Sequence, residues 1–374
     1  MRMLPETQKF LSLGNRLVLM LILLTSMAVA QWNRQSPVPT FLDVRGVAAP
    51  TAQRVFIATN DDSFDDGGSL FESGDGGASW VQRDVPFSLA SPLNGIFFLN
   101  ENLGWVYGND NYRTTDGGTT WTALPVLGST YFMEFYTPDF GVTTGNFGVY
   151  ASRDGGLNWE PSPEGMFTFA FADAQNGIGA ATSGVYRTTD GGVTFTLVQS
   201  GDAAAVAFLS GSVALAIVDD NFMRSTDGGA TWSTVVSAEG RSDLKVISGD
   251  VVLAYGRSGV FPNFDFRTFR SADGGQSWTD LGTIWPDGVL GFAVADPQTV
   301  VAADPRGSMF QSTDAGQNWT QTFTSPGPLP SFFNSAAPVF ADAQTGYFGY
   351  GAGFVIKTMD GGASWSQISS GTGQ

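Results

Sequence analysis

Short apolar runs separated by turns rich in glycine, asparagine and aspartate recur along the chain after residue 30. In one such stretch an apolar strand at residues 96–99 meets a turn at 100–102, and a second strand follows at 104–107. A third strand ends at Thr114, and a fourth leaves from Trp121. No helical period interrupts these four strands, so the pattern predicts one four-stranded antiparallel sheet.

An eight-residue pattern, called here the box motif, marks the end of each stretch. It consists of Ser or Thr, any residue, Asp, Gly (once Ala), Gly, two further residues and an aromatic. It occurs at residues 73–80, 114–121, 152–159, 188–195, 225–232, 271–278, 312–319 and 358–365. Successive box aspartates are 36 to 46 residues apart, a period typical of β-propeller blades. The sequence therefore predicts an all-β fold, a single β-propeller of four-stranded antiparallel blades with a box motif at each third-to-fourth strand hairpin.

The eight motifs favour eight blades, with seven as the alternative. Trp32 followed by Pro37 resembles the end of a box strand. This segment would pair with the last blade in place of Trp365 and leave a seven-bladed ring with one irregular unit. In both arrangements we expect residues 31–374 to form one domain, because the repeats leave no room for a second.

The box residues fit a structural role. Each carboxylate is placed to accept hydrogen bonds from N–H groups of its own turn, the hydroxyl adds another local bond, the glycines supply positive φ, and the aromatic fills space beneath. A calcium site is the alternative, but one carboxylate per blade is too dispersed to chelate a metal. We therefore assign turn-forming roles to Asp75, Asp116, Asp154, Asp190, Asp227, Asp273, Asp314 and Asp360. The cation just before the motif in five units is interpreted as part of a solvated surface: Arg113, Arg187, Arg224, Arg270 and Lys357.

The first 30 residues differ from the rest. Arg2, Lys9 and Arg16 precede an apolar run at 17–25, and Ala-Val-Ala at 28–30 supplies a cleavage site. We predict a signal peptide at 1–30 and export to the periplasm or the extracellular space. The apolar run is too short for a bilayer core of roughly 30 Å, and no later segment is longer, so we expect no transmembrane segment.

Composition narrows the chemistry. The chain has no cysteine, which excludes disulfides, thiolate catalysis and cysteine-ligated zinc, and no histidine, the side chain most used for acid-base work. Its formal net charge is −17, so we expect no nucleic-acid partner. We expect no cofactor and a monomeric state.

The box motif resembles the Asp-box (BNR) repeat of sialidases, sortilin-type receptors, xyloglucan-degrading glycosidases and photosystem II stability and assembly factors. Residues 104–108 (Gly-Trp-Val-Tyr-Gly) followed by 113–121 (Arg-Thr-Thr-Asp-Gly-Gly-Thr-Thr-Trp) closely resemble the assembly-factor repeat, and 346–351 with 357–365 repeat the match. The similarity runs through most of residues 32–370. It implies a secreted, non-enzymatic propeller that holds partner proteins, although the assembly factors resemble seven-bladed rings.

An enzyme is the alternative. Sialidases carry an Arg-Ile-Pro motif, three arginines that grip the substrate carboxylate and six blades, and no Arg-Ile-Pro occurs here. A glycoside hydrolase needs only two carboxylates, about 5 Å or about 6.5–9.5 Å apart, which sequence alone does not exclude.

A binding site is expected on the face opposite the box motifs, where the second-to-third and fourth-to-first strand loops lie. Three loops there are rich in carboxylates and amides, at 60–66, 109–111 and 219–221. They include Asp61, Asp62, Asp110, Asp219 and Asp220. Such oxygens are the ligands calcium prefers, although Asn and Asp are also ordinary turn residues.

Two further features are candidates for function. The sixth unit has an insertion at 257–269 with Arg257, Phe264 and Arg267, which either forms a partner-binding hot spot or packs over the next blade. Glu134 lies on a first strand among aromatic residues, where it would line the central channel as a functional or a structural carboxylate.

The sequence thus predicts a secreted propeller that binds a protein or glycan through the face opposite the box motifs. The alternative is a sialidase-like or other glycoside hydrolase that uses paired carboxylates on that face.

Overall fold

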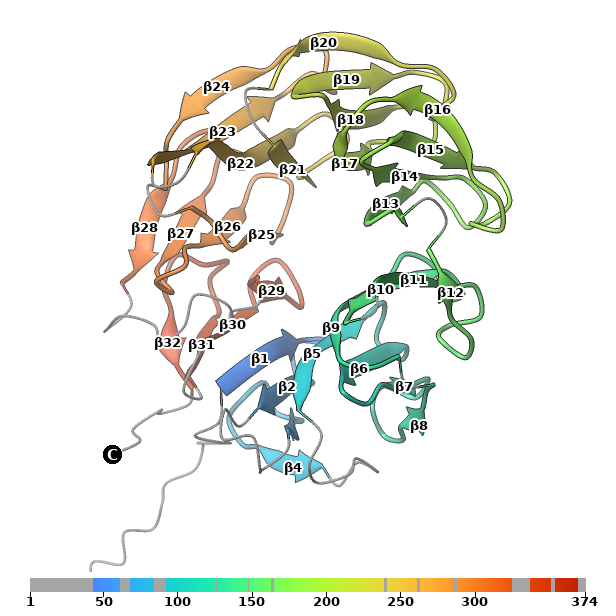
Figure 1. The fold of residues 1–374 in the computed structure, drawn as a ribbon. Coiled ribbons are helices and arrows are strands. Elements are labelled where there is room, and N and C mark those ends of the chain that lie inside the picture. Colours follow the sequence, from blue (N-terminus) through green and yellow to red (C-terminus); the bar gives the residue numbers. More distant parts are fainter. Residues whose placement is uncertain are drawn as a thin grey trace, which may run out of the picture. The chain divides into compact units, whose positions relative to one another are not determined.

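Eight four-stranded antiparallel sheets, the blades, follow one another along the chain in a computed structural model (Figure 1). The structure describes residues 43–60, 68–83, 92–125, 127–146, 148–162, 165–238, 241–260, 263–285, 288–324, 337–350 and 354–368. Every described element is a strand. The part of the chain described therefore includes no helix of the length and apolarity that crossing a membrane requires.

Each blade takes its four strands from consecutive segments of the chain. Blade 1 comprises β1 (Asp43–Ala48), β2 (Val55–Asn60), β3 (Ser69–Ser73) and β4 (Val81–Arg83), and blade 2 comprises β5 (Leu93–Phe98), β6 (Gly104–Gly108), β7 (Tyr112–Thr114) and β8 (Thr122–Ala123). Blade 3 comprises β9 (Thr130–Phe135), β10 (Gly141–Gly145), β11 (Gly148–Ser152) and β12 (Glu160–Pro161), and blade 4 comprises β13 (Thr168–Phe171), β14 (Gly177–Ala181), β15 (Gly184–Thr188) and β16 (Thr196–Ser200).

Blade 5 comprises β17 (Ala203–Phe208), β18 (Ala214–Val218), β19 (Asn221–Ser225) and β20 (Ser233–Ser237), and blade 6 comprises β21 (Arg241–Val246), β22 (Val252–Val260), β23 (Asn263–Ser271) and β24 (Thr279–Gly282). Blade 7 comprises β25 (Gly291–Val294), β26 (Val300–Ala303), β27 (Met309–Ser312) and β28 (Thr320–Phe323), and blade 8 comprises β29 (Val339–Phe340), β30 (Gly346–Tyr350), β31 (Phe354–Thr358) and β32 (Ser366–Gln367). The prediction of eight blades is confirmed, and the seven-bladed alternative is wrong.

Burial follows the position of a strand within its blade. The second strands β14, β18 and β26 are buried along their whole length, because neighbouring blades cover both faces of the sheet there. The outermost strands, such as β4, are exposed. Apolar clusters join each blade to the next, as where Ile178 of blade 4 and Val206 of blade 5 share one core.

Among the described residues the ring closes through side chains, and the first and last blades exchange no strand. The last blade takes its outer strand from β32, next to Trp365, and Trp32 lies outside the described residues. Val355 of blade 8 packs in one cluster with Val44 and Val55 of blade 1.

The box turns are built from hydrogen bonds between neighbouring residues. In blade 5, Asp227 accepts bonds from the backbone N–H of Thr231 (2.9 Å) and from its hydroxyl (2.6 Å). The hydroxyl of Ser225 donates to Asp227 (2.7 Å) and accepts the N–H of Gly229 (2.9 Å). The other boxes repeat this arrangement, with an amide of Asn158 or Asn318 in place of the hydroxyl donor in two of them and Ala315 in place of a glycine in one. The box aspartates therefore hold turns.

The interpretation that the cations before the box motifs belong to a solvated surface is wrong. Each is half-buried, and four of the five donate to a backbone carbonyl in the box turn of the following blade. The donor–acceptor distances are 2.8 Å for Arg187 to Gly228, 2.7 Å for Arg224 to Gly274, 2.8 Å for Arg270 to Ala315 and 2.6 Å for Lys357 to Gly76. Arg113 lies instead over the ring of Trp105, whose indole N–H donates to Gly155 of the next box. We call these contacts the inter-blade latches.

The latch of Lys357 joins blade 8 to blade 1, so it tests how the ring is held closed. Lys357→Met keeps the apolar stem and removes the donor, and we expect it to lower the free energy of unfolding by about 1–2 kcal/mol. Lys357→Arg, which places at this junction the residue used at three others, should stay within about 0.5 kcal/mol of wild type. Urea unfolding measures both variants. Arg306→Met, at an exposed position, is the control, and an equal loss there would contradict the latch.

The box turns also predict an acid limit. Hydrogen bonds from the neighbouring hydroxyl hold the pKa of Asp75, Asp116, Asp190 and Asp227 at about 2. Because folding lowers these pKa values, the stabilisation is complete above the unfolded value near 3.9 and is lost as the pH falls through 2. We expect Asp227→Asn to cost about 1 kcal/mol at pH 7 and less near pH 2, measured by urea unfolding. An equal cost at both pH values would contradict the prediction.

Candidate functional site

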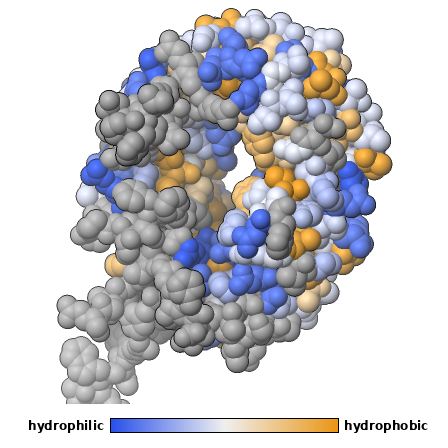
Figure 2. Space-filling model, viewed as in Figure 1, coloured by the Kyte–Doolittle hydropathy of each residue, from blue (hydrophilic) through white to orange (hydrophobic). Residues whose placement is uncertain are grey.

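The inner strands of the blades surround an opening at the centre of the ring, bordered by apolar side chains (Figure 2). A cavity of about 430 Å³ lies there, lined by residues from blades 1, 2, 6, 7 and 8. Its lining includes Pro50, Asn100 and Ala341, which lie in or next to first-to-second strand turns. Those turns contact the box turns, as where Gly117 N–H bonds Asn102, so the central cavity is at the box face of the ring.

Charged side chains from two inner strands approach one another at the channel. On β9, Met133 and Phe135 pack against blade 2, so the alternation of the strand turns Glu134 to its other side. The hydroxyl of Tyr136 donates to Glu134 (3.0 Å). On β21, Asp243 and Lys245 occupy alternate positions, and both interact electrostatically with Glu134.

Burial dominates the electrostatics of this cluster. It raises the pKa of Glu134, against the opposing effects of the Tyr136 hydrogen bond and the charge of Lys245. Burial likewise lowers the pKa of Lys245, against the charges of Asp243 and Glu134. Burial therefore disfavours the charged form of Glu134 and of Lys245 relative to water. The opposite charge of the other group favours the charged form in part.

A second cavity, of about 260 Å³, lies beside β21 between blade 6 and the start of blade 7. Its lining includes Tyr255, Phe266, Trp285 and Val289, with Asp243 at one side. The hydroxyl of Tyr255 donates to Asp243 (3.1 Å). Trp285 belongs to a fourth-to-first strand connection, so this aromatic cavity lies toward the face opposite the boxes.

The carboxylate-rich loops that the structure describes, at 109–111 and 219–221, do not converge. Asp61 and Asp62 lie outside the described residues. Asp110 is half-buried beside Asn111, whose amide donates to Thr130 (3.2 Å) and so joins blade 2 to blade 3. Asp219 and Asp220 are exposed, with φ of 48° and 57°.

These two residues form the β18–β19 turn, where Asp219 accepts a bond from Asp202 N–H (2.8 Å). No group of three or more acidic side chains suited to a metal ion occurs among the described residues. The calcium hypothesis remains a prediction, because most of the 60–66 loop lies outside them.

The insertion predicted in the sixth unit consists of the paired strands β22 and β23. Arg267 forms an ion pair with Asp280 and lies over the ring of Phe269, within its own blade. Phe266 points instead into the aromatic cavity wall. The strands carry the backbones of Arg257 and Phe264, but their side chains lie outside the described part of the chain.

Sequence reasoning found Glu134 and missed its counterparts on β21. Asp243 and Lys245 also lie on a first strand, the location that drew attention to Glu134. Because β9 and β21 are far apart in the sequence, the sequence alone did not predict that their side chains approach one another across the channel.

The raised pKa of Glu134 predicts a stabilising substitution. In the unfolded chain this carboxyl ionises near pH 4.3, so stability falls as the pH rises from that value toward the higher folded pKa. Glu134→Gln keeps an acceptor for Tyr136 without the charge. We expect it to raise the free energy of unfolding at pH 7 and to leave it unchanged at pH 3.5, measured by urea unfolding. A loss of stability at pH 7 would contradict the burial argument.

Known proteins resemble the chain in sequence over part of its length and in fold over most of it. No protein-family profile matches the chain. Xyloglucanase Xgh74A of Acetivibrio thermocellus is 29% identical over 162 residues, which are 39% of this chain and 18% of that enzyme. YCF48 bound to D1 peptide superimposes with a TM-score of 0.51 at 16% identity, covering 87% of this chain and 95% of that one. YCF48 from Cyanidioschyzon merolae gives 0.50 at 18% identity, covering 87% and 97%. These structures show a shared propeller fold.

Proposed function

We propose that this protein is an exported, non-enzymatic β-propeller that binds a partner protein through the face opposite its box motifs. The signal peptide predicted at residues 1–30 supports export to the periplasm or the extracellular space. A glycan is the other ligand that such a face would suit, because sugars also stack on aromatic rings.

One observation carries this proposal: aromatic side chains are exposed or line a cavity on that face, at two places around the ring. Tyr131 and Phe132, at the start of β9, are 58% and 42% exposed. The aromatic cavity with Phe266 and Trp285 opens toward the same face. Aromatic residues next to a pocket are typical of protein-binding hot spots.

Two comparisons support a protein partner. The repeats resemble those of photosystem II stability and assembly factors, and one YCF48 structure of the same fold holds a D1 peptide. The net charge of −17 favours a neutral or basic partner surface over nucleic acid.

The test compares two faces of the same molecule. A variant with Tyr131→Ala and Phe132→Ala should capture at least tenfold less of the partner from an envelope extract than wild type, by quantitative mass spectrometry. The matched control carries Val193→Ala and Met359→Ala, which remove exposed apolar side chains from two box turns and should leave capture unchanged. Loss in the control alone would place binding on the box face, and equal capture by all three proteins would contradict the proposal.

A glycoside hydrolase is the second candidate, favoured by Glu134 and Asp243. Two carboxylates in different environments, one with a raised pKa, are the arrangement that such enzymes use. In this candidate the paired carboxylates lie at the channel and not on the loops where the sequence analysis expected them. It requires turnover of xyloglucan, sialosides or chromogenic glycosides that both Glu134→Gln and Asp243→Asn abolish. We expect no turnover.

A further inference from the structure

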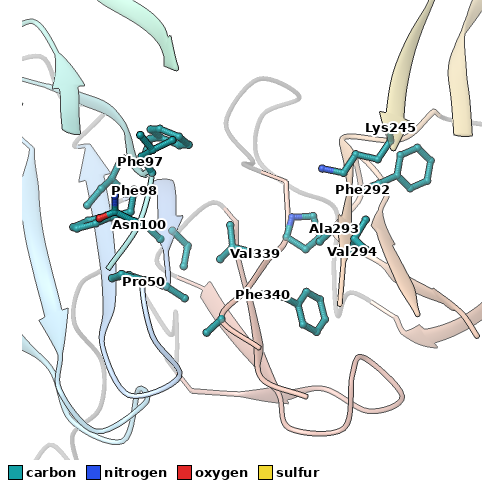
Figure 3. A pocket seen from close by; sticks show the side chains of 17 residues that line it. Pro50, Phe97, Phe98, Asn100, Lys245, Phe292, Ala293, Val294, Val339 and Phe340 are labelled. Carbon is teal, nitrogen blue, oxygen red and sulfur yellow. The ribbon is translucent and has the colours of Figure 1, made fainter. Parts of the chain in front are cut away.

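Most of the side chains that line the central cavity at the box face are apolar, although its surface also exposes many polar atoms. Phe97 and Phe98 of blade 2 lie on one side, Phe292 of blade 7 lies on the other, and Val339 and Phe340 of blade 8 lie between them (Figure 3). Its volume of about 430 Å³ falls within the range of about 300–1,000 Å³ that is usual for small-molecule sites. An occupant would therefore be a small molecule.

Lys245 is the one charged residue in this lining, and its ammonium group points into the cavity beside Phe292 (Figure 3). Among the described residues no carboxylate forms an ion pair with Lys245 within 4.0 Å. Asn100, the other polar side chain there, already accepts bonds from Asn102 and Leu103 N–H at 3.0 and 2.9 Å. The ammonium group thus has donors to offer an occupant.

Burial disfavours the charged form of Lys245 and so lowers the pKa of this lysine. Asp243 and Glu134 offset part of that cost from a distance, but neither lines the central cavity. An anionic group inside the cavity would supply the direct partner that the ammonium group lacks. The two nearby carboxylates would repel a second negative charge, so one anionic group is favoured over two.

We propose that the central cavity binds a small organic monocarboxylate, with its carboxylate on Lys245 and its body against the apolar side chains of the lining, such as Phe97, Val294 and Val339. This site is separate from the partner-binding face proposed above, because it opens at the box end of the channel. Failure of either proposal leaves the other standing.

The lysine content of the chain allows a direct test. The sequence has three lysines, Lys9 in the predicted signal peptide, Lys245 in the cavity and Lys357 in a latch. Acetylation of the folded protein by an N-hydroxysuccinimide ester, read by peptide mass spectrometry, reports Lys245 with Lys357 as an internal reference. The probe is 3-phenylpropanoate, and its neutral amide, 3-phenylpropanamide, is the matched control ligand.

We expect saturating 3-phenylpropanoate to slow acetylation of Lys245 at least fivefold and that of Lys357 not at all. The neutral amide should protect neither, and phenylsuccinate, a dicarboxylate, should protect Lys245 more weakly. No protection at 10 mM acid, or equal protection by acid and amide, would overturn the proposal.

Calorimetry with variants provides a second measurement. Lys245→Met should bind 3-phenylpropanoate at least tenfold more weakly than wild type, and urea unfolding checks that the variant is folded. Lys357→Arg keeps its latch and should bind as wild type does. Unchanged affinity in Lys245→Met would also overturn the proposal.

Discussion

The inter-blade latch is the interaction on which the ring depends. A four-stranded blade leaves both faces of its sheet to be buried, so it is stable only between two neighbours. At four junctions an Arg or Lys just before one box motif donates to a carbonyl in the box turn of the next blade. At others Gln311, Arg153 or the Trp105 indole makes the equivalent bond. The box turn is therefore both the end of its own hairpin and the acceptor for the blade before it, and Lys357 completes the circle.

That arrangement explains why the box aspartates are poor candidates for chemistry. Their carboxylate oxygens already accept several bonds from their own turns, which keeps the chain rigid at the outer edge of the box face. Freedom for chemistry lies instead on the inner strands, whose edges face the channel. Glu134, Asp243 and Lys245 lie on two of these strands. Burial disfavours the charged forms of Glu134 and Lys245, which is why we look to this cluster for function.

The channel and the face opposite the boxes suit different occupants. The central cavity is small and holds one cation among mostly apolar side chains, so it suits the small acid proposed above. The opposite face exposes Tyr131 and Phe132 on blade 3 and has the aromatic cavity at blades 6 and 7, so it suits the larger partner proposed above. β21 lines both cavities, with Lys245 in one wall and Asp243 in the other.

The sequence by itself determined the repeat, the strands and the box turns, because each depends on residues a few positions apart. The strands expected at 96–99 and 104–107 are β5 and β6, and eight motifs gave eight blades. Only the tertiary structure decided what depends on different blades. Arg187, Arg224, Arg270 and Lys357 look solvated in a single repeat, since their acceptors belong to the next blade. Glu134 and Lys245 belong to strands far apart in sequence, and closure of the ring brings them to one channel. Local hydrogen bonds depend only on neighbouring residues. Contacts across the ring depend instead on the number of blades that close it and on the spacing between those blades.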